Sequence, residues 1–276
     1  MAISTQPLPG TTIDPRYPDS DDEPLAETDL HLLAIIYLHG ALRYFFRDRD
    51  DAGVWADLFL YYKEGNGEKR KAPDVMVAFG VVGKHPRRSF RTWEEGVVPA
   101  VIFEITSKKT CHEDEHGKKE TYQQLGVKEY YLFDPEDRSI RPRLQGFRLH
   151  EGRYVALAPD DAGRLISQQL GMLLVVDDPL LRLIDVKTGE CLMSFDEAID
   201  GLDEAKQSMR QARQQAEQAL QQADQARQQA DQSRQLAEKA QKQAERAGIE
   251  SAAQRQHIAD LEAELARLRA AQASDQ

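Results

Sequence analysis

The sequence predicts an α/β protein whose mixed sheet is flanked by helices and followed by a long C-terminal coiled-coil helix. Three observations predict this architecture. Between about residues 25 and 200, short apolar runs rich in β-branched and aromatic residues alternate with segments of helical periodicity. Near residue 200 the composition changes, and Ala, Gln, Arg and Glu then dominate without a proline. A seven-residue repeat runs through the same C-terminal quarter.

The 276 residues carry a formal charge of −11, from 47 acidic and 36 basic side chains. This balance argues against bulk attraction to a polyanion, so any contact with nucleic acid must be local. The sequence shows neither the basic start of a signal peptide nor an apolar run long enough to span a membrane. Because its two cysteines, Cys111 and Cys191, lie far apart, we expect a soluble protein of a reducing cytoplasm with no membrane partner.

The composition predicts three regions. Residues 1–24 hold five of the twelve prolines and the acidic run DPRYPDSDDEP, so we expect them to be extended or disordered. A globular domain is expected over residues 25–200, and an alanine-rich coiled coil over residues 201–276. Residues 203–276 carry 11 basic and 12 acidic side chains, so nearly all of the net charge belongs to the earlier regions.

The first half of the domain is predicted to contain one helix and three strands. Thr28 or Asp29 can cap a helix whose apolar side chains recur at helical spacing as far as the charged turn RDRDD. The β-rich run at residues 54–62 predicts a strand that ends at the turn EGNGEK. A second strand is predicted to start at Asp74, and a third to span about residues 98–107.

The second half is predicted to begin with a polar helix over residues 112–125, which Gly126 ends. The run EYYLFDP predicts a fourth strand, and GFRLHEGRYVALA predicts a hairpin that turns at Glu151 and Gly152. The segment LRLIDVKTGE adds another strand and a tight turn. Strands on both sides of this helix are typical of a mixed sheet.

The third strand contains a carboxylate that needs a partner. Both faces of the strand are apolar before Glu104, which predicts a central, buried position. Because a bare buried charge is costly, Glu104 must be paired, protonated or bound to a metal. Asp74, at the start of the preceding strand, is its neighbour if these two strands pair. Two carboxylates brought together repel, and a divalent cation relieves the repulsion.

Simpler interpretations compete with a metal site, since an Asp after Pro is usually a turn or cap residue and a strand Glu often pairs with a lysine. The downstream segment favours the site. On a helix, Asp114, Lys118 and Tyr122 lie one turn apart on a face that can be directed at the carboxylates, although a solvated charged face has the same spacing. Glu27 and His31 could add a polar group, but the preferred interpretation is a satisfied helix face.

An ordered series of motifs includes these residues. It comprises PDV at 73–75, RTWEEGVVP at 91–99, FEITS at 103–107, the spaced Asp114, Lys118 and Tyr122, and LGVKEYYLFDP at 125–135. Together they resemble the bacterial restriction endonucleases of the Uma type, a branch of the PD-(D/E)XK nuclease superfamily. The resemblance spans about residues 25–200 and includes the later LQGFRL and TGECL segments.

The resemblance implies a restriction-endonuclease-like fold, in which helices flank a mixed sheet, and a divalent ion, usually Mg²⁺ with Mn²⁺ as the alternative. Transferred to this sequence, the metal ligands would be Asp74 and Glu104, with the backbone carbonyl of Ile105 as a further ligand. The ion would lower the pKa of a bound water and stabilise charge on the scissile phosphate.

The sequence departs from the superfamily pattern at the catalytic lysine. The expected position, two residues past the Glu, holds Thr106. We expect Lys118 to be the catalytic lysine in its place, because the family's helix carries a Lys at this point. Lys108, on the same strand face but at the strand's end, is the alternative.

The C-terminal repeat predicts a left-handed coiled coil. From Ala205 onward, small or apolar residues recur at alternating steps of four and three, with one interruption at Gln254, and the register continues through Ile258 to Leu268. About 67 residues would form a rod of roughly 100 Å. Alanine buries little apolar area, so pairing should depend on the leucine-rich end, and a single marginal helix is the alternative.

Two functions follow from these features. The first is a metal-dependent endonuclease, which cuts within a DNA chain. Its catalytic residues would be Asp74, Glu104 and Lys118, and its rod would bring two active sites together. The second is a non-enzymatic module that has lost activity with its Lys and serves in oligomerisation or nucleic-acid binding. The acidic domain favours the second function, whereas both retained carboxylates favour the first.

Overall fold

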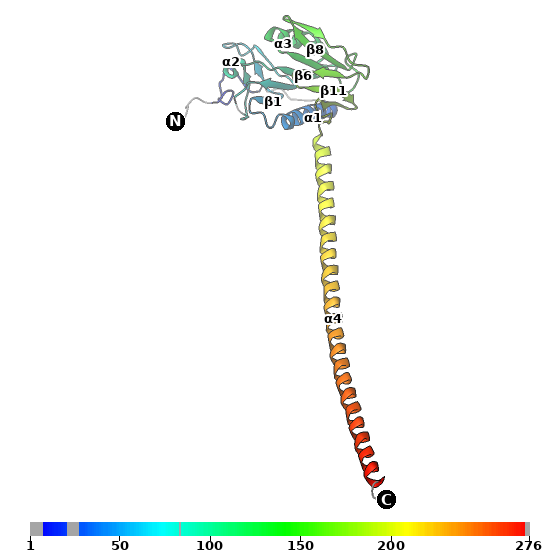
Figure 1. Cartoon of the computed structure of the whole chain (residues 1–276). Coiled ribbons are helices and arrows are strands. Elements are labelled where there is room, and N and C mark those ends of the chain that lie inside the picture. Colours follow the sequence, from blue (N-terminus) through cyan, green and yellow to red (C-terminus); the bar gives the residue numbers. More distant parts are fainter. Residues whose placement is uncertain (1–7, 21–27, 83, 274–276) are drawn as a thin grey trace. The chain divides into compact units, whose positions relative to one another are not determined.

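The computed structural model describes residues 8–20, 28–82 and 84–273, with side chains as far as Leu265 (Figure 1). The chain forms two compact units, Met1–Gly201 and Leu202–Gln276. The first unit contains the mixed sheet and the helices that flank it, which confirms the predicted fold class.

A six-stranded sheet lies at the centre of the first unit, with the strand order β1-β4-β6-β7-β8-β9. Its strands are β1 (Ala52–Ala56), β4 (Val75–Phe79), β6 (Val101–Ile105), β7 (Glu129–Phe133), β8 (Leu144–His150) and β9 (Arg153–Ala156). The neighbours β6 and β7 run parallel, and the other neighbouring pairs run antiparallel. The crossover between β6 and β7 contains a π-helical turn, η1 (Glu113–Lys118), and helix α3 (Lys119–Leu125).

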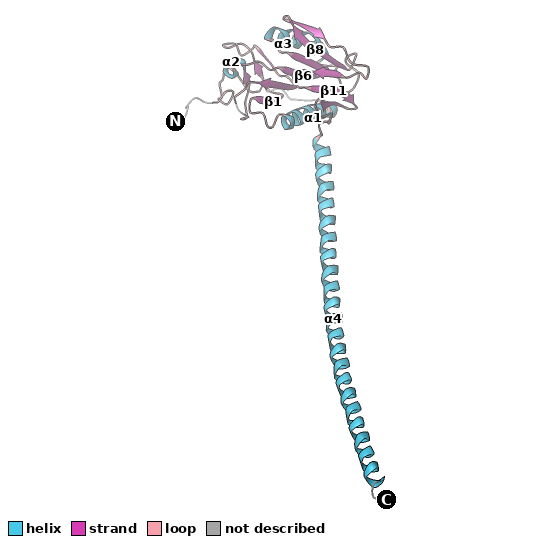
Figure 2. Cartoon of the chain, in the orientation of Figure 1, coloured by secondary structure: helices cyan, strands magenta, loops and turns pink. Residues whose placement is uncertain are grey.

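Each face of this sheet is covered by other elements (Figure 2). Helix α1 (Asp29–Phe45) packs on one face together with a second sheet, β10 (Leu165–Ser167), β11 (Met172–Asp177) and β12 (Leu180–Asp185). The other face packs against α3 and a small sheet of β3 (Arg70–Lys71), β2 (Leu60–Tyr61) and β5 (Phe90–Arg91), which is followed by the short helix α2 (Thr92–Glu95). Side chains of β6 alternate between the two cores, as expected for a strand buried on both faces.

Several local signals predicted elements correctly. Thr28 caps α1, where its Oγ1 accepts a hydrogen bond from the backbone N–H of His31. Gly126 ends α3 in the left-handed conformation. The β8–β9 hairpin turns at Glu151 and Gly152, both at positive φ. Each signal is a local backbone requirement, which sequence alone can reveal.

Three elements differ from the prediction. The expected strand at 54–62 is divided into β1 and β2, because Asp57 adopts a φ of 48° and the chain leaves the central sheet there. The strand expected to start at Asp74 begins one residue later. The helix expected over 112–125 contains the π-helical turn η1, whose wider winding the apolar pattern did not indicate.

Residues 8–20 lie against the domain, in contrast to the disorder expected for residues 1–24. Tyr17 is buried against the rings of Tyr61 and Trp93, and its hydroxyl accepts a hydrogen bond from the N–H of Gly65. The Gly10 N–H donates to Glu94. These long-range contacts offset the local preference for an extended chain. The remainder of the segment lies outside the described residues.

The chain continues from the first unit into helix α4 (Phe195–Ala273), a single helix of 79 residues. At 1.5 Å per residue it extends about 120 Å. Its described side chains are exposed along the whole length, including those of Ile258, Leu261 and Leu265. None of the helices in the described part of the chain has a stretch long and apolar enough to cross a bilayer.

Candidate active site

The two carboxylates singled out in the sequence belong to neighbouring strands of the central sheet. Val75 of β4 is paired with Phe103 of β6, so the same register continued by one residue sets Asp74 across from Glu104. Asp74 Oδ2 accepts a hydrogen bond of 2.6 Å from the backbone N–H of Ile105. The β4–β6 pairing therefore brings Asp74 to the end of β6, next to the backbone that carries Glu104.

Glu104 is fully buried and has a hydrogen-bond donor at each carboxylate oxygen. Lys118 Nζ lies 2.8 Å from Oε2, and the hydroxyl of Tyr122 donates to Oε1 at 2.8 Å. Both donors come from the helical segment between β6 and β7, as the spacing of the sequence predicted. The site opens to solvent through Asp74 and Lys118, whose side chains are 20% and 15% exposed.

The π-helical turn η1 holds the second anionic partner of the lysine. Asp114 Oδ1 lies 3.1 Å from Lys118 Nζ, and its Oδ2 accepts a hydrogen bond of 2.9 Å from Thr106 Oγ1. The hydroxyl of Tyr130 donates to the backbone carbonyl of Asp114 at 2.8 Å. Isolated π-helical turns within longer helices are frequent at functional sites. Here two residues hold the turn on the sheet: Thr106, which directly follows β6, and Tyr130 of β7.

An excess of negative charge marks this cluster, because three carboxylates face one ammonium group. Burial raises the pKa of Glu104 to about 8; Lys118 opposes this rise, whereas Asp74 and Asp114 add to it. Burial alone would lower the pKa of Lys118, but the charges of Glu104 and Asp114 outweigh it and raise that pKa above its usual range. Lys118 is therefore a cation, and the excess negative charge favours either a proton on Glu104 or an additional bound cation.

The carboxylate oxygens of this cluster fit a divalent ion that keeps several of its water ligands. Each carboxylate oxygen of Glu104 accepts one donor and retains another lone pair. Asp114 Oδ1 is buried and lies within ion-pair distance of Lys118, yet it accepts no well-directed hydrogen bond in the described structure. The described residues contain no group of three His, Cys, Asp or Glu side chains that could cage a metal. Mg²⁺ is commonly held by one or two carboxylates together with water and phosphate oxygens.

A pocket of about 400 Å³ lies beside this cluster, lined by residues that include His31, Thr106, Lys108 and Lys109. His31 is buried at the start of α1, and its Nε2 lies 3.8 Å from Asp74 Oδ1. His31 and Thr106 thus connect the pocket with the carboxylates. Lys108 belongs to the pocket wall, where the structure gives its ammonium no contact with Glu104, in contrast to Lys118.

Sequence reasoning identified most of this cluster but missed two relationships. The sequence favours a satisfied helix-face role for His31, whereas in the structure it lies next to Asp74. Glu27, the other candidate on that segment, lies outside the described residues. The superfamily pattern marks position 106 only as the place of an absent lysine, so it does not predict the hydrogen bond from Thr106 to Asp114. A buried threonine beside a helix carboxylate was the available signal.

Comparison with known families decides the affiliation of this domain. The Uma2 family model, described as "Putative restriction endonuclease", matches residues 8–177. The chain belongs to the Uma2 family. The matched region contains all of the clustered residues described above, and it also includes residues 8–20, which pack on the domain. Membership supports a nuclease-like domain and agrees with the resemblance of the sequence motifs.

The solved structures that resemble this Uma2 chain include a crystal structure of "a putative nuclease belonging to DUF820" from Anabaena variabilis. The two chains are 14% identical, with a TM-score of 0.40, and the similarity covers 53% of this chain and 76% of the other. No curated protein matches the chain significantly.

Proposed function

We propose that the protein is a divalent-metal-dependent nuclease that hydrolyses phosphodiester bonds within DNA. The contact between Lys118 and Glu104 carries this proposal, because it restores a lysine to the carboxylates after Thr106 has replaced the expected one. Membership of the Uma2 family supports the reaction class. A similar fold alone would not, since one fold can carry many activities.

Each group of the cluster has a definite chemical role in this proposal. Asp74 and Glu104, with the carbonyl of Ile105, would hold Mg²⁺ or Mn²⁺; the Ile105 N–H already orients Asp74. When bound, such an ion lowers the pKa of a water molecule and stabilises negative charge on the phosphate. Lys118, a cation at the solvent-open edge of the site, would contact the attacking water or the phosphate oxygens.

The ion pair with Asp114 and the hydrogen bond from Tyr122 to Glu104 position these groups. Asp114 keeps the Lys118 ammonium close to Glu104, and Thr106 fixes Asp114. Burial and the neighbouring Glu104 raise the pKa of Tyr122 well above its usual value, so its hydroxyl remains a donor at neutral pH. Residues at the sheet and on the crossover segment thus both hold Lys118 and Glu104 in position.

We further propose that α4 pairs with α4 of a second copy as a parallel coiled coil and so brings two nuclease domains together. The seven-residue seam and the exposure of Ile258, Leu261 and Leu265 support this arrangement. Two active sites would suit cleavage of both strands of a duplex. We place the protein in a reducing cytoplasm, where its two free thiols, Cys111 and Cys191, would remain reduced.

A non-enzymatic nucleic-acid-binding or oligomerising module is the second candidate. The full burial of Glu104 favours it, since both oxygens already have protein donors. The deciding experiment incubates the purified full chain with supercoiled plasmid and linear DNA, with Mg²⁺, with Mn²⁺, or with a chelator. Cleavage that needs the metal and is lost in Glu104→Gln supports the nuclease. Absence of cleavage under all conditions contradicts it in favour of the module.

A further inference from the structure

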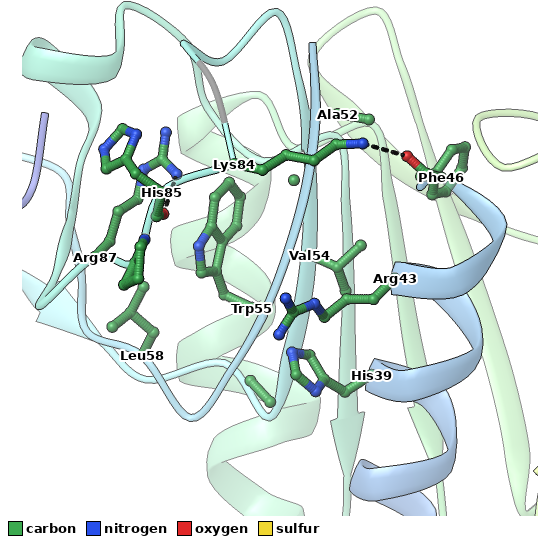
Figure 3. A pocket seen from close by; sticks show the side chains of 13 residues that line it. His39, Arg43, Phe46, Ala52, Val54, Trp55, Leu58, Lys84, His85 and Arg87 are labelled. Carbon is green, nitrogen blue, oxygen red and sulfur yellow. Dashed lines mark hydrogen bonds between the residues drawn. The ribbon is translucent and has the colours of Figure 1, made fainter. Parts of the chain in front are cut away.

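A second cavity lies along the edge strand β1, away from the carboxylates. Its volume is about 290 Å³, and it lies between α1, β1 and the loop at residues 84–87 (Figure 3). Its wall carries five basic side chains: His39 and Arg43 from α1, and Lys84, His85 and Arg87 from the loop. None of the described residues that line it is Asp or Glu. In a chain with a net charge of −11, five basic side chains around one pocket with no lining acid call for a specific cause.

Two of these cations already have structural roles. Arg87 is buried in an ion pair with Glu95, with Nε 2.5 Å from Oε1, and its guanidinium lies 4.7 Å from the centre of the Trp55 ring. Lys84 Nζ donates a hydrogen bond of 3.0 Å to the carbonyl of Phe46 and a second to that of Arg47. Glu95 neutralises Arg87, whereas the carbonyls accepting from Lys84 carry no formal charge. Lys84 therefore adds positive charge to the pocket.

Arg43 is different, because its guanidinium has no hydrogen-bond or ion-pair partner in the described part of the chain. Figure 3 shows this side chain extending from α1 toward His39 and Trp55. Burial lowers the pKa of His39, and the charge of Arg43 lowers it further. The imidazole is thus held neutral beside an uncompensated cation. Arg43 leaves a planar fork of donors unused at the wall of a cavity.

We propose that this pocket binds a phosphate group, carried either by a DNA backbone or by a free phosphate compound. An arginine fork matches two phosphate oxygens, and lysine supplies a further point charge. The cavity of about 290 Å³ is large enough for one phosphate, because it is many times the roughly 30 Å³ that one water molecule takes in the liquid. His39 offers a neutral ring beside that position, and the Trp55 indole forms an apolar wall.

The position of the pocket gives the proposal a link with the nuclease function. β1 ends at Ala56, and the next residue, Asp57, donates its N–H to the carbonyl of Asp74 at 3.2 Å. The segment that lines the pocket therefore leads directly to the candidate metal site. If the proposed nuclease function holds, Arg43 and Lys84 provide the local phosphate contact that an acidic domain needs in order to hold DNA.

The test compares Arg43, which lies on α1 beside the edge strand β1, with Arg153 on the opposite edge strand, β9. Arg43→Gln removes the unpaired guanidinium of the pocket. Arg153→Gln makes the same charge change on β9, where Arg153 is exposed and has no side-chain partner among the described residues. Both side chains are exposed, so we expect both variants to fold, which thermal unfolding checks.

Two binding measurements on the full chain, with chelator present so that DNA stays intact, distinguish the two sources of phosphate. Calorimetry uses inorganic phosphate, and fluorescence anisotropy uses a labelled DNA duplex. We expect Arg43→Gln to weaken phosphate binding at least tenfold and Arg153→Gln to leave it unchanged. A matching loss of DNA affinity, with a smaller salt dependence, assigns the pocket to the DNA backbone. Unchanged DNA affinity assigns it to a free phosphate compound.

Two results would overturn the proposal: no binding of phosphate or DNA by the parent chain, or equal effects of Arg43→Gln and Arg153→Gln. The second result would mean that only overall charge matters. These binding measurements do not require catalysis. If the cleavage assay contradicts the nuclease function, the phosphate-binding proposal therefore still holds. If the binding measurements contradict the phosphate pocket, the nuclease function is still tested by cleavage with the parent chain and Glu104→Gln.

Discussion

Lys118 Nζ lies 2.8 Å from Glu104 Oε2, so a side chain of the crossover helix reaches a carboxylate of the central sheet. In the PD-(D/E)XK pattern the lysine belongs to the strand itself, at the position that Thr106 occupies here. Thr106 retains an indirect connection, because it donates to Asp114 and Asp114 pairs with Lys118. Thr106 thus occupies the usual position of the lysine and also helps, through Asp114, to hold Lys118 on the crossover segment.

The first prediction concerns Glu104→Gln, which should abolish metal-dependent cleavage while leaving thermal stability in chelator unchanged or higher. Burial raises the pKa of Glu104 from 4.5 to about 8. A raised folded pKa contributes stability below pH 4.5 that is lost as the pH rises through about 8, and glutamine avoids that loss. Plasmid cleavage and melting curves at pH 6 and pH 8.5 measure both effects. A variant that cuts as well as the parent would refute the proposed mechanism.

The second prediction compares Lys118→Ala with Lys108→Ala. Loss of Lys118 removes the cation beside Glu104 and should reduce cleavage by about 100-fold or more. Lys108→Ala changes an exposed pocket residue and should cost less. Because Lys118→Ala also leaves buried carboxylates unpaired, rates are compared at a temperature where melting curves show both variants folded. Equal losses would mean that the third catalytic position is misplaced, and indifference to both would indicate that no lysine takes part.

The third prediction tests the support that Thr106 gives to Asp114. Thr106→Val keeps the shape of the side chain but removes the donor to Asp114 Oδ2, which should destabilise the domain by about 1–3 kcal/mol. Cleavage should fall mainly through kcat, because Lys118 loses its fixed partner. Thr106→Ser keeps the hydroxyl and should recover most of the rate. If valine and serine behave alike, the hydrogen bond has no role in positioning Lys118.

The sequence predicted those parts of the fold that depend on local chemistry. Thr28, Gly126 and the Glu151–Gly152 turn each mark an element boundary through a backbone requirement. Strands β10 and β11 were missed; β10 is only three residues long and pairs with β11 across a tight turn. The break at Asp57 was missed because the strands on its two sides pair with different partners, β1 with β4 and β2 with β3 and β5, which no local signal reveals.

The candidate site was partly predictable for a related reason. A buried strand that contains a carboxylate identified Glu104, and helical spacing placed Lys118 on the face directed at it. His31 could not be assigned to Asp74, because that contact depends on how α1 packs on the sheet. Arg43 gave no signal in the sequence, since an exposed arginine on a helix becomes unusual only when the pocket around it is known.

The fourth prediction concerns Asp134, which follows β7 and accepts backbone N–H groups of Glu136, Arg138, Ser139 and Ile140. Burial would raise the pKa of Asp134, but these donors outweigh it and lower the pKa below 3.8. A lowered folded pKa contributes stability above pH 3.8 that is lost as the pH falls through the folded value.

Asp134→Asn should therefore destabilise the domain by about 1–2 kcal/mol near pH 7, and the difference should shrink below pH 3.8. Urea unfolding at several pH values measures it. Asp161→Asn, at an exposed carboxylate with no side-chain partner in the described structure, is the control and should have little effect. A difference between parent and Asp134→Asn that does not vary with pH would contradict the role assigned to the charge.

The fifth prediction concerns self-association through α4. A parallel pair sets Leu261 and Leu265 beside their own copies, whereas an antiparallel pair opposes them to alanine or polar layers, so the leucine end should determine the orientation. Both leucines are about half exposed in the single chain, which leaves their apolar surface available for a partner. Alanine layers along the rest of the seam contribute little area, and the leucine end is therefore the part on which pairing depends.

Replacing Leu261 and Leu265 together by Ala should remove about 2–5 kcal/mol per buried leucine, enough to dissociate so weak a seam. Ile249→Ala provides the control, because Ile249 lies off the repeat and is 70% exposed. A chain ended after Gly201 keeps the whole first compact unit, including the ion pair between Arg182 and Glu197, and should remain folded with a lower oligomeric state. Sedimentation that gives the parent's mass for both the double variant and the shortened chain would exclude α4 as the assembly element.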